Sequence, residues 1–193
     1  MNPIIYILRH ERRPLDNSTY FVELTDDGKL NAQHLADRIN ELDVDVIYCS
    51  PFLRTIQTAL PYCKKFNKKI KIEYSLYEYI DQTIFNSYTY KHSHKELYEI
   101  VEGIEENIDE SYTSFLDIDR LNYKEFMDTC YNRVVPFIDH LLDTHKDKKI
   151  LLLSHGTILG IIKKYLEKGG KFTKEEEHLG LYPKMGELTK IVK

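Results

Sequence analysis

The chain has 193 residues, a formal net charge of −4, 42% hydrophobic residues and 30% charged residues. This length allows one domain with a sizeable core, and the hydrophobic content excludes a disordered chain. Eight glycines and six prolines are too few for a low-complexity or collagen-like chain, and the acidic balance argues against a broad basic surface for nucleic acid.

Strands and helices are predicted to alternate in the first half of the chain. Ile4 to Leu8 is a short continuous apolar run, typical of a strand that is covered on both faces, and Val44 to Cys49 is a second predicted strand. Between them a helix start is indicated at Thr25, followed by two aspartates, and apolar residues then recur at helical spacing. Ser50-Pro51 predicts the start of a second helix, with serine as cap, and Pro61 is expected to end or kink that helix.

The second half continues the alternation. Ile70 to Tyr74, Ile150 to Leu153 and Leu188 to Val192 are predicted strands. Two apolar stripes predict amphipathic helices, and a third helix is expected after His155, through about Leu166. The stripes consist of Leu97, Ile100, Val101, Ile104 and Ile108, and of Phe126, Cys130, Val134, Phe137, Ile138 and Leu141. The alternation predicts an α/β fold, a three-layer α/β/α sandwich with a mostly parallel central sheet.

Cysteines and apolar runs indicate the compartment. Cys49, Cys63 and Cys130 are odd in number and lack metal-motif spacing, so we expect small buried residues in a reducing compartment rather than disulfides or a zinc site. Ile4 to Leu8 is too short for a signal peptide, and the run from Ile150 to Ile162 is interrupted and too short to span a membrane. We expect a cytoplasmic protein without a membrane partner, either a monomer or a homodimer.

The predicted strand ends carry the residues that suit phosphate chemistry. Arg9-His10 follows the first strand, Arg54 lies just after the second, Glu78 after the third and His155-Gly156 after the fourth. Ligands bind parallel sheets beyond the carboxyl ends of the strands, so we expect these side chains to meet at one rim.

Each residue type has a part in such chemistry. Arginine matches phosphate oxygens with a planar fork of donors, and neutral imidazole accepts a phosphoryl group on one ring nitrogen. A helix N-terminus after His155 adds backbone donors, and a carboxylic acid with a raised pKa protonates a leaving alkoxide. Taken singly, each histidine, Arg54 or Glu78 is explained as an ordinary structural or surface residue, so the prediction depends on the whole set.

Four segments together resemble the histidine phosphatase superfamily, the group that includes cofactor-dependent phosphoglycerate mutases and many small phosphatases. The segments are Leu8-Arg9-His10, Leu24-Thr25-Asp26-Asp27-Gly28, Tyr48 to Ala59 and Leu153-Ser154-His155-Gly156. The third is the most specific, because it combines Ser-Pro, an arginine three residues on and then Gln-Thr-Ala. The agreement covers most of the chain except about 87–122.

The resemblance implies a phosphoglycerate mutase-like fold and a mechanism. His10 would be the nucleophile that forms a phosphohistidine, and Glu78 the proton donor and later the base. Arg9, Arg54 and His155, beside Gly156, would hold the phosphoryl oxygens. Glu73 and Asp81 are competitors for the role of Glu78. The resemblance implies no metal and no organic cofactor.

The chain departs from the family pattern directly after His10. The family usually has glycine where this chain has Glu11, whose carboxylate would repel a phosphate unless it is turned away or paired. Arg12 and Arg13 are candidates to neutralise it and, with Asp16 and Asn17, further candidates for phosphate contacts. Asp16 falls at the spacing of the family's phosphate-binding asparagine, and Asn17 is one residue late.

We therefore expect one histidine phosphatase-like domain over 1–193 that hydrolyses a small phosphorylated metabolite through a phosphohistidine on His10, with no nucleic-acid or membrane partner. A cofactor-dependent phosphoglycerate mutase and a phosphate-ester binding module without turnover are the alternatives. The segment of about 87–122 is expected to form a variable acidic cap, since nine acids and no lysine or arginine lie between Glu96 and Asp119. A solvated helix face and loop is the other interpretation of that segment.

Overall fold

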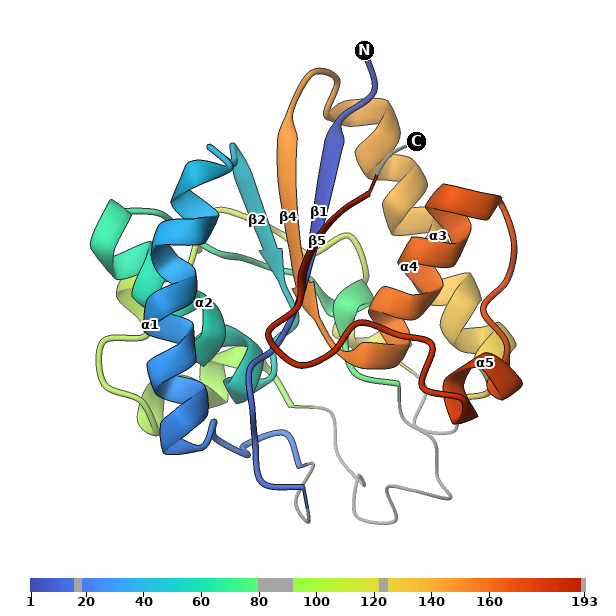
Figure 1. Ribbon diagram of the computed structural model, residues 1–193. Helices are drawn as coiled ribbons and strands as arrows, with labels where there is room; N and C mark the ends of the chain where they lie inside the picture. Colours follow the sequence, from blue (N-terminus) through green and yellow to red (C-terminus); the bar gives the residue numbers. More distant parts are fainter. Residues whose placement is uncertain (16–18, 80–91, 122–124, 192–193) are drawn as a thin grey trace.

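A central sheet organises the molecule (Figure 1). The computed structural model describes residues 1–15, 19–79, 92–121 and 125–191. Within these ranges the strand order is β3-β2-β4-β1-β5. The first four strands in the chain pair in parallel, and β5 pairs antiparallel with β1. The strands are β1 (Ile4–Arg9), β2 (Val46–Cys49), β3 (Lys71–Ile72), β4 (Lys149–Ser154) and β5 (Leu188–Ile191).

Helices cover both faces of this sheet (Figure 1). On one side lie α1 (Asp26–Glu41) and α2 (Leu53–Phe66), and on the other α3 (Met127–Thr144) and α4 (Gly156–Lys168). A short helix, α5 (Lys174–His178), follows α4 and was not predicted from the sequence. The predicted α/β sandwich with a mostly parallel sheet is confirmed.

Side chains of the two central strands alternate between two cores. Tyr6 and Leu8 of β1 face the core that α1 and α2 cover, whereas Ile5 and Ile7 face the core that α3 and α4 cover. The same alternation holds along β4 between residues 150 and 153. Burial of each such side chain contributes about 2 kcal/mol, so the apolar run of each strand stabilises both layers at once.

The start of α1 follows the sequence pattern. The Thr25 hydroxyl accepts a hydrogen bond from the Gly28 N–H at 3.1 Å, and two aspartates occupy the first turn. A Cβ at Gly28 would lie 2.3 Å from the Arg12 carbonyl oxygen. This glycine therefore lets the chain that follows β1 pass directly against the helix.

The predicted start of the second helix is wrong, and Pro61 does not end this helix. α2 begins at Leu53, with Phe52 as N-cap and no side-chain cap bond, because the Ser50 hydroxyl binds His155 instead. Pro61 lies inside the helix, which continues to Phe66 and ends where Asn67 adopts a left-handed conformation.

The amphipathic helix predicted from the stripe at residues 97–108 is also wrong. This segment forms two short 3-10 turns, η2 (His94–Glu99) and η3 (Glu105–Asn107). Between them Gly103 has a φ of +70°, which ends any continuous helix, and Ile108 bridges to Ile70 beside β3. Leu97, Ile104 and Ile108 are buried, while Ile100 is 52% exposed. Most of the apolar side chains of this stripe are therefore buried by short turns, although their spacing predicts a helix.

The three cysteines are free and buried, as the sequence predicted. In the part of the chain that the structure describes, no helix combines the length and apolar character needed to cross a bilayer.

Candidate active site

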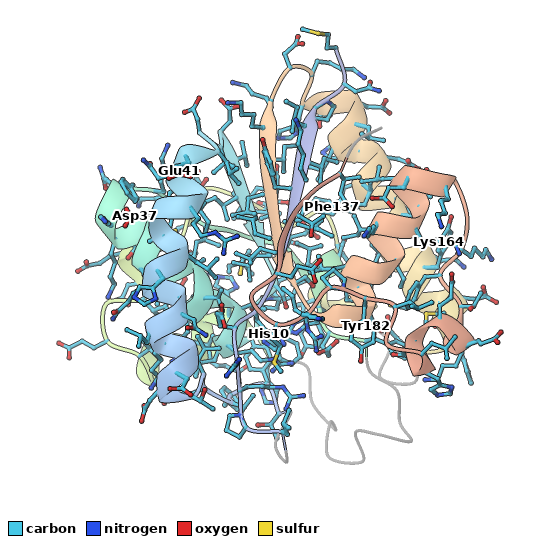
Figure 2. The ribbon with its side chains drawn as sticks, in the orientation of Figure 1. His10, Asp37, Glu41, Phe137, Lys164 and Tyr182 are labelled. Atoms are coloured by element: carbon cyan, nitrogen blue, oxygen red, sulfur yellow. The ribbon has the colours of Figure 1, made fainter. Side chains whose placement is uncertain are left out.

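Two histidines meet at the carboxyl end of the sheet. His10 directly follows β1 and lies at the end of the sheet away from the chain termini (Figure 2). His155 directly follows β4, and the two rings lie 5.3 Å apart, centre to centre. Both side chains are buried, at 1% and 0% exposure. Because β1 and β4 pair in register up to Arg9 and Ser154, the sheet itself brings the imidazoles together.

The protonation of His10 follows from its backbone contact. Its Nδ1 lies 2.7 Å from the Glu11 carbonyl oxygen, which can only accept, so Nδ1 carries the proton and Nε2 carries the lone pair. Burial, with Arg54 and His155 nearby, holds the pKa of His10 well below its ordinary value. His10 is thus a neutral imidazole with a fixed tautomer at neutral pH.

His155 is held by a neighbour on each ring nitrogen. Its Nε2 lies 2.8 Å from the Ser50 hydroxyl. Its Nδ1 lies 3.1 Å from a Glu78 carboxylate oxygen and 3.2 Å from Nη2 of Arg54. Burial lowers the pKa of His155 to about 4, against the opposing effect of Glu78. Its orientation is therefore fixed from both sides.

Two arginines flank the histidines. Arg54, fully buried in the first turn of α2, donates through Nη1 to the Thr19 carbonyl at 3.0 Å and stacks over the Phe52 ring at 4.4 Å. Arg9, the last residue of β1, donates to the Pro183 carbonyl at 2.9 Å and lies 5.0 Å from the centre of the Tyr182 ring. Each guanidinium is thus held by a backbone carbonyl and an aromatic face.

Glu78 lies in the same cluster. Its Oε2 is 3.2 Å from Nη2 of Arg54 and 3.1 Å from His155. Burial raises the pKa of Glu78, but His155 and Arg54 outweigh burial and hold it well below the ordinary value. The expected raised pKa is therefore not present in this state, because the carboxylate is paired with Arg54 and His155.

Glu73, one competitor of Glu78, does not lie in this cluster. Glu73 is fully buried and caps the 3-10 turn η1 (Tyr74–Leu76), where it accepts the Ser75 N–H at 2.8 Å. It also accepts the Phe115 N–H at 2.8 Å, so it anchors a distant segment. Asp81 lies outside the described residues.

Gly156 allows a close approach at the N-terminus of α4. A Cβ there would lie 2.9 Å from the Tyr182 ring and 3.1 Å from Cζ of Arg9. Glycine therefore keeps Arg9 and Tyr182 against the first turn of a helix whose free N–H groups favour an anion.

Glu11 is buried beside a different set of groups. Its carboxylate lies 3.3 Å from the Arg12 backbone nitrogen and 3.4 Å from the Asn31 amide nitrogen, and a Cβ at Gly186 would lie 2.1 Å from one of its oxygens. Arg12 is exposed, while Arg13 is close enough to contribute to the lowered pKa of Arg9. Asp16 and Asn17 lie outside the described residues.

Sequence reasoning missed Ser50, Thr19, Tyr182 and Pro183. The Ser50-Pro51 pattern predicts a helix cap at Ser50, whereas the Ser50 hydroxyl contacts His155 in the structure. Tyr182 and Pro183 lie in a connection without a motif, so only the fold places them beside Arg9.

One ligand atom each of His10, Glu78 and His155 lies within 4.8 Å of the others, a spacing that could hold a metal ion. However, Nη2 of Arg54 lies 3.2 Å from both Glu78 and His155, which places a fixed positive charge in the same space. The charge distribution therefore favours an anion over a cation.

A cavity of about 240 Å³ opens beside Arg9, Glu78 and Gly156. Its outer wall comes from Tyr79, Thr157, Glu177, His178 and Tyr182, and the Thr157 hydroxyl donates to Glu177 at 2.7 Å. None of the described residues 92–121 lines it, so the acidic cap stays a prediction.

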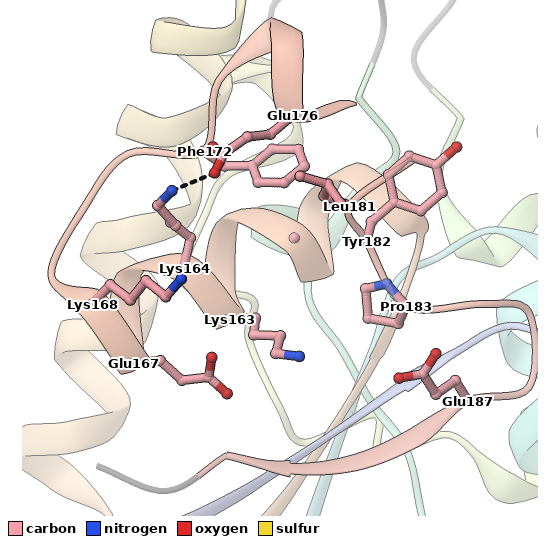
Figure 3. Close-up of a pocket in the computed structure, with 11 residues that line it drawn as sticks. Lys163, Lys164, Glu167, Lys168, Phe172, Glu176, Leu181, Tyr182, Pro183 and Glu187 are labelled. Carbon is pink, nitrogen blue, oxygen red and sulfur yellow. Dashed lines mark hydrogen bonds and ion pairs between the residues drawn. The ribbon is translucent and has the colours of Figure 1, made fainter. Parts of the chain in front are cut away.

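A larger cavity of about 350 Å³ shares Tyr182 with it (Figure 3). The lysines and acids of that cavity come mainly from α4, α5 and the segment before β5, and neither histidine of the site lines it. Neither histidine lines the smaller cavity either, but Arg9, Glu78 and Gly156 do, so the smaller cavity is the one that adjoins the cluster.

Comparison with known proteins identifies the family. The sequence profile of the histidine phosphatase superfamily (branch 1) matches residues 5–180. The chain belongs to this superfamily. The expectation of a phosphatase is thereby confirmed at the level of the enzyme class.

Individual relatives are distant. A probable phosphatase of Schizosaccharomyces pombe is 23% identical over 89% of this chain and 78% of its own length. Phosphoserine phosphatase 1 of Hydrogenobacter thermophilus is 26% identical over 69% of this chain, which spans 59% of that protein. The crystal structure of the ecdysone phosphate phosphatase of Bombix mori has a TM-score of 0.66, 18% identity, and coverage of 97% of this chain and 88% of that one. This last likeness shows the shared fold.

Proposed function

We propose that this histidine phosphatase hydrolyses the monoester of a small phosphorylated metabolite through a phosphohistidine on His10. The observation that carries the proposal is the 2.7 Å contact from Nδ1 of His10 to the Glu11 carbonyl. It leaves the Nε2 lone pair as the nucleophile, in a site where Arg54, Arg9 and His155 gather donors for a phosphate.

Substrate binding exchanges the partners of the cationic groups. A phosphate dianion that takes Arg54 and His155 as partners separates them from Glu78 and adds negative charge beside that carboxylate. Both effects raise the pKa of Glu78 from its low value in the present pairing. The same event raises the pKa of His155, which then donates to the phosphate.

The transfer step breaks the ester P–O bond. Nε2 of His10 attacks phosphorus and forms the P–N bond, while the electron pair of the broken bond stays on the ester oxygen. That oxygen takes the proton of Glu78, and the alcohol leaves. Fixed donors on the equatorial oxygens stabilise the charge of the transition state.

The hydrolysis step restores the enzyme. The Glu78 carboxylate takes a proton from water as the water oxygen attacks phosphorus, and the P–N bond breaks. Its electron pair returns to Nε2 of His10, and phosphate leaves with Glu78 protonated for the next cycle.

The leaving group is assigned to the 240 Å³ cavity beside Arg9 and Glu78. Two tyrosines, a threonine hydroxyl and the Glu177 carboxylate line it, so it suits a small leaving group with hydroxyl or amino groups and disfavours a second phosphate. The named relatives act on phosphoserine and on ecdysone phosphate. The chain's own cavity favours the smaller kind of ester.

The test is phosphate release from p-nitrophenyl phosphate and from a panel of metabolite monoesters, with His10→Ala as the control. We expect wild-type turnover that exceeds the variant by at least about 10³-fold. Equal inactivity of both proteins on every ester would contradict the enzymatic proposal. Interconversion of 3- and 2-phosphoglycerate without phosphate release would instead establish the mutase alternative. Binding without a trapped phosphohistidine would establish the binding module.

A further inference from the structure

Arg133 in α3 is a buried cation outside the phosphate cluster. Its Nε and Nη2 donate to the two carboxylate oxygens of Glu125 at 2.6 and 2.8 Å. The side chains are 6% and 3% exposed. A bidentate pair of this kind neutralises the charge and fixes the plane of the guanidinium, so the remaining donors of Arg133 point in set directions.

Those donors bind the backbone of the segment that ends at Glu78. Nη1 donates to the Ser75 carbonyl at 2.8 Å and to the Tyr77 carbonyl at 3.1 Å, and Nη2 lies 3.5 Å from the Glu78 carbonyl. The chain leaves η1 in an extended conformation at Tyr77, with φ −52° and ψ 150°. Its carbonyls therefore turn toward α3, where the guanidinium meets them.

A second side chain completes this arrangement. The buried Ser154 hydroxyl donates to the Leu76 carbonyl at 2.7 Å. Ser154 is the last residue of β4 and precedes His155 directly. Arg133 and Ser154 thus contact the carbonyls of five consecutive residues, 74–78, and Ser154 ties this segment to the strand that precedes His155.

We propose that Arg133 is a positioning residue for proton transfer by Glu78. With Ser154, it fixes the backbone of Ser75 to Glu78, so that the carboxyl group stays within reach of the leaving oxygen. Arg133 touches neither phosphate nor leaving group and acts through the peptide groups. This inference rests on the proposed phosphatase function and adds to it the element that orients the acid.

The dependence of rate on the leaving group tests the role. Phenyl phosphate and p-nitrophenyl phosphate are both aryl phosphate monoesters. Phenolate is a more basic leaving group than p-nitrophenolate, so its departure depends more on the proton from Glu78. Arg133→Lys keeps the positive charge but removes the planar set of guanidinium donors. We expect it to lower kcat/KM about tenfold or more for phenyl phosphate. For p-nitrophenyl phosphate the loss should stay below about threefold. Ser154→Ala should change the ratio in the same direction, and Glu78→Gln should show the largest change.

The control is Val134→Ala, one residue along α3 and fully buried in the core. It should lower thermal stability without changing the ratio of the two rates. If Arg133→Lys is folded and leaves the ratio of the two kcat/KM values unchanged, the inference is overturned. If circular dichroism shows that Arg133→Lys is unfolded, an unchanged ratio in Ser154→Ala overturns it instead. A wild-type protein inactive on these two esters and on the whole metabolite panel contradicts the proposed function itself, whereas unchanged ratios in an active enzyme contradict only the role of Arg133.

Discussion

Glu11 occupies the position where the family usually has glycine, and the structure shows how the chain accommodates it. The Gly186 N–H contacts the carbonyls of Arg9 and His10 at 3.1 and 3.2 Å, and Gly186 has a φ of +72°. A Cβ there would lie 2.1 Å from a carboxylate oxygen of Glu11. The glycine missing after His10 thus has a counterpart at Gly186, before β5, and the side chain of Glu11 packs into the space that Gly186 leaves.

This packing predicts an energetic coupling between Glu11 and Gly186. Gly186→Ala should cost about 3 kcal/mol, from left-handed strain of about 1–2 kcal/mol plus the clash with Glu11. Gly180→Ala is the matched control, because Gly180 has a φ of +66° and nothing within 4 Å of an added Cβ. Urea unfolding measures both. Adding Glu11→Ala to Gly186→Ala should recover most of the stability that Gly186→Ala loses beyond Gly180→Ala. An equal loss of stability in the two glycine variants would contradict the coupling.

The element that organises the site is α2. Its Gln57 side chain accepts the Leu24 N–H at 2.9 Å, and its Thr58 hydroxyl accepts the Glu11 N–H at 3.0 Å. Arg54 of the same helix reaches Glu78 and His155. The Arg…Gln-Thr sequence therefore fixes the chain after β1 as well as the guanidinium of Arg54.

Thr58→Val tests this element. The change keeps the shape of the side chain but leaves the buried Glu11 N–H without its acceptor, which should cost about 1–3 kcal/mol of stability. Because the Glu11 carbonyl orients His10, kcat should fall about tenfold while the KM changes little. Gln57→Ala, which removes a contact farther from His10, is the comparison. Equal kcat values for the two variants would contradict the account.

Sequence periodicity predicted the central elements well and the peripheral ones poorly. Ile4 to Leu8 and Ile150 to Leu153 are unbroken apolar runs because both faces of these strands are buried, so the signal is strong. The apolar residues at 97–108 have helical spacing in the sequence, but they lie on two short 3-10 turns on either side of Gly103. Periodicity alone does not distinguish this arrangement from a helix. The motif residues His10, Arg54 and His155 do lie together, whereas Arg133 and Tyr182 reach this region through long-range contacts without a local signal.

At the scale of the molecule, the net charge of −4 hides a local concentration of arginines near the end of β1. Three of the seven arginines lie between Arg9 and Arg13, and a fourth, Arg54, lies beside His155. The fold buries two neutral histidines next to these cations, and burial lowers both pKa values. Stability and pH are therefore linked through the site.

The sign of this linkage is set by the unfolded chain. Below pH 6.5 an unfolded histidine binds a proton, whereas His155 stays neutral in the folded state until about pH 4. Folded stability should therefore fall as the pH drops, by about 2–3 kcal/mol for His155 between pH 7.5 and pH 4.5. Denaturant unfolding of wild type and His155→Gln across this range measures the effect. The variant should show the shallower loss, and parallel curves would contradict it.

The central claim is a covalent phosphoryl group on His10. Rapid quenching of the enzyme during turnover of p-nitrophenyl phosphate into alkali, followed by peptide mass spectrometry, measures it directly. We predict a phosphorylated peptide that contains His10 in wild type, a larger amount in Glu78→Gln, where attack of water is slowed, and none in His10→Ala. An active wild-type enzyme without phosphohistidine at any time point, or with the phosphoryl group on another residue, would contradict the account.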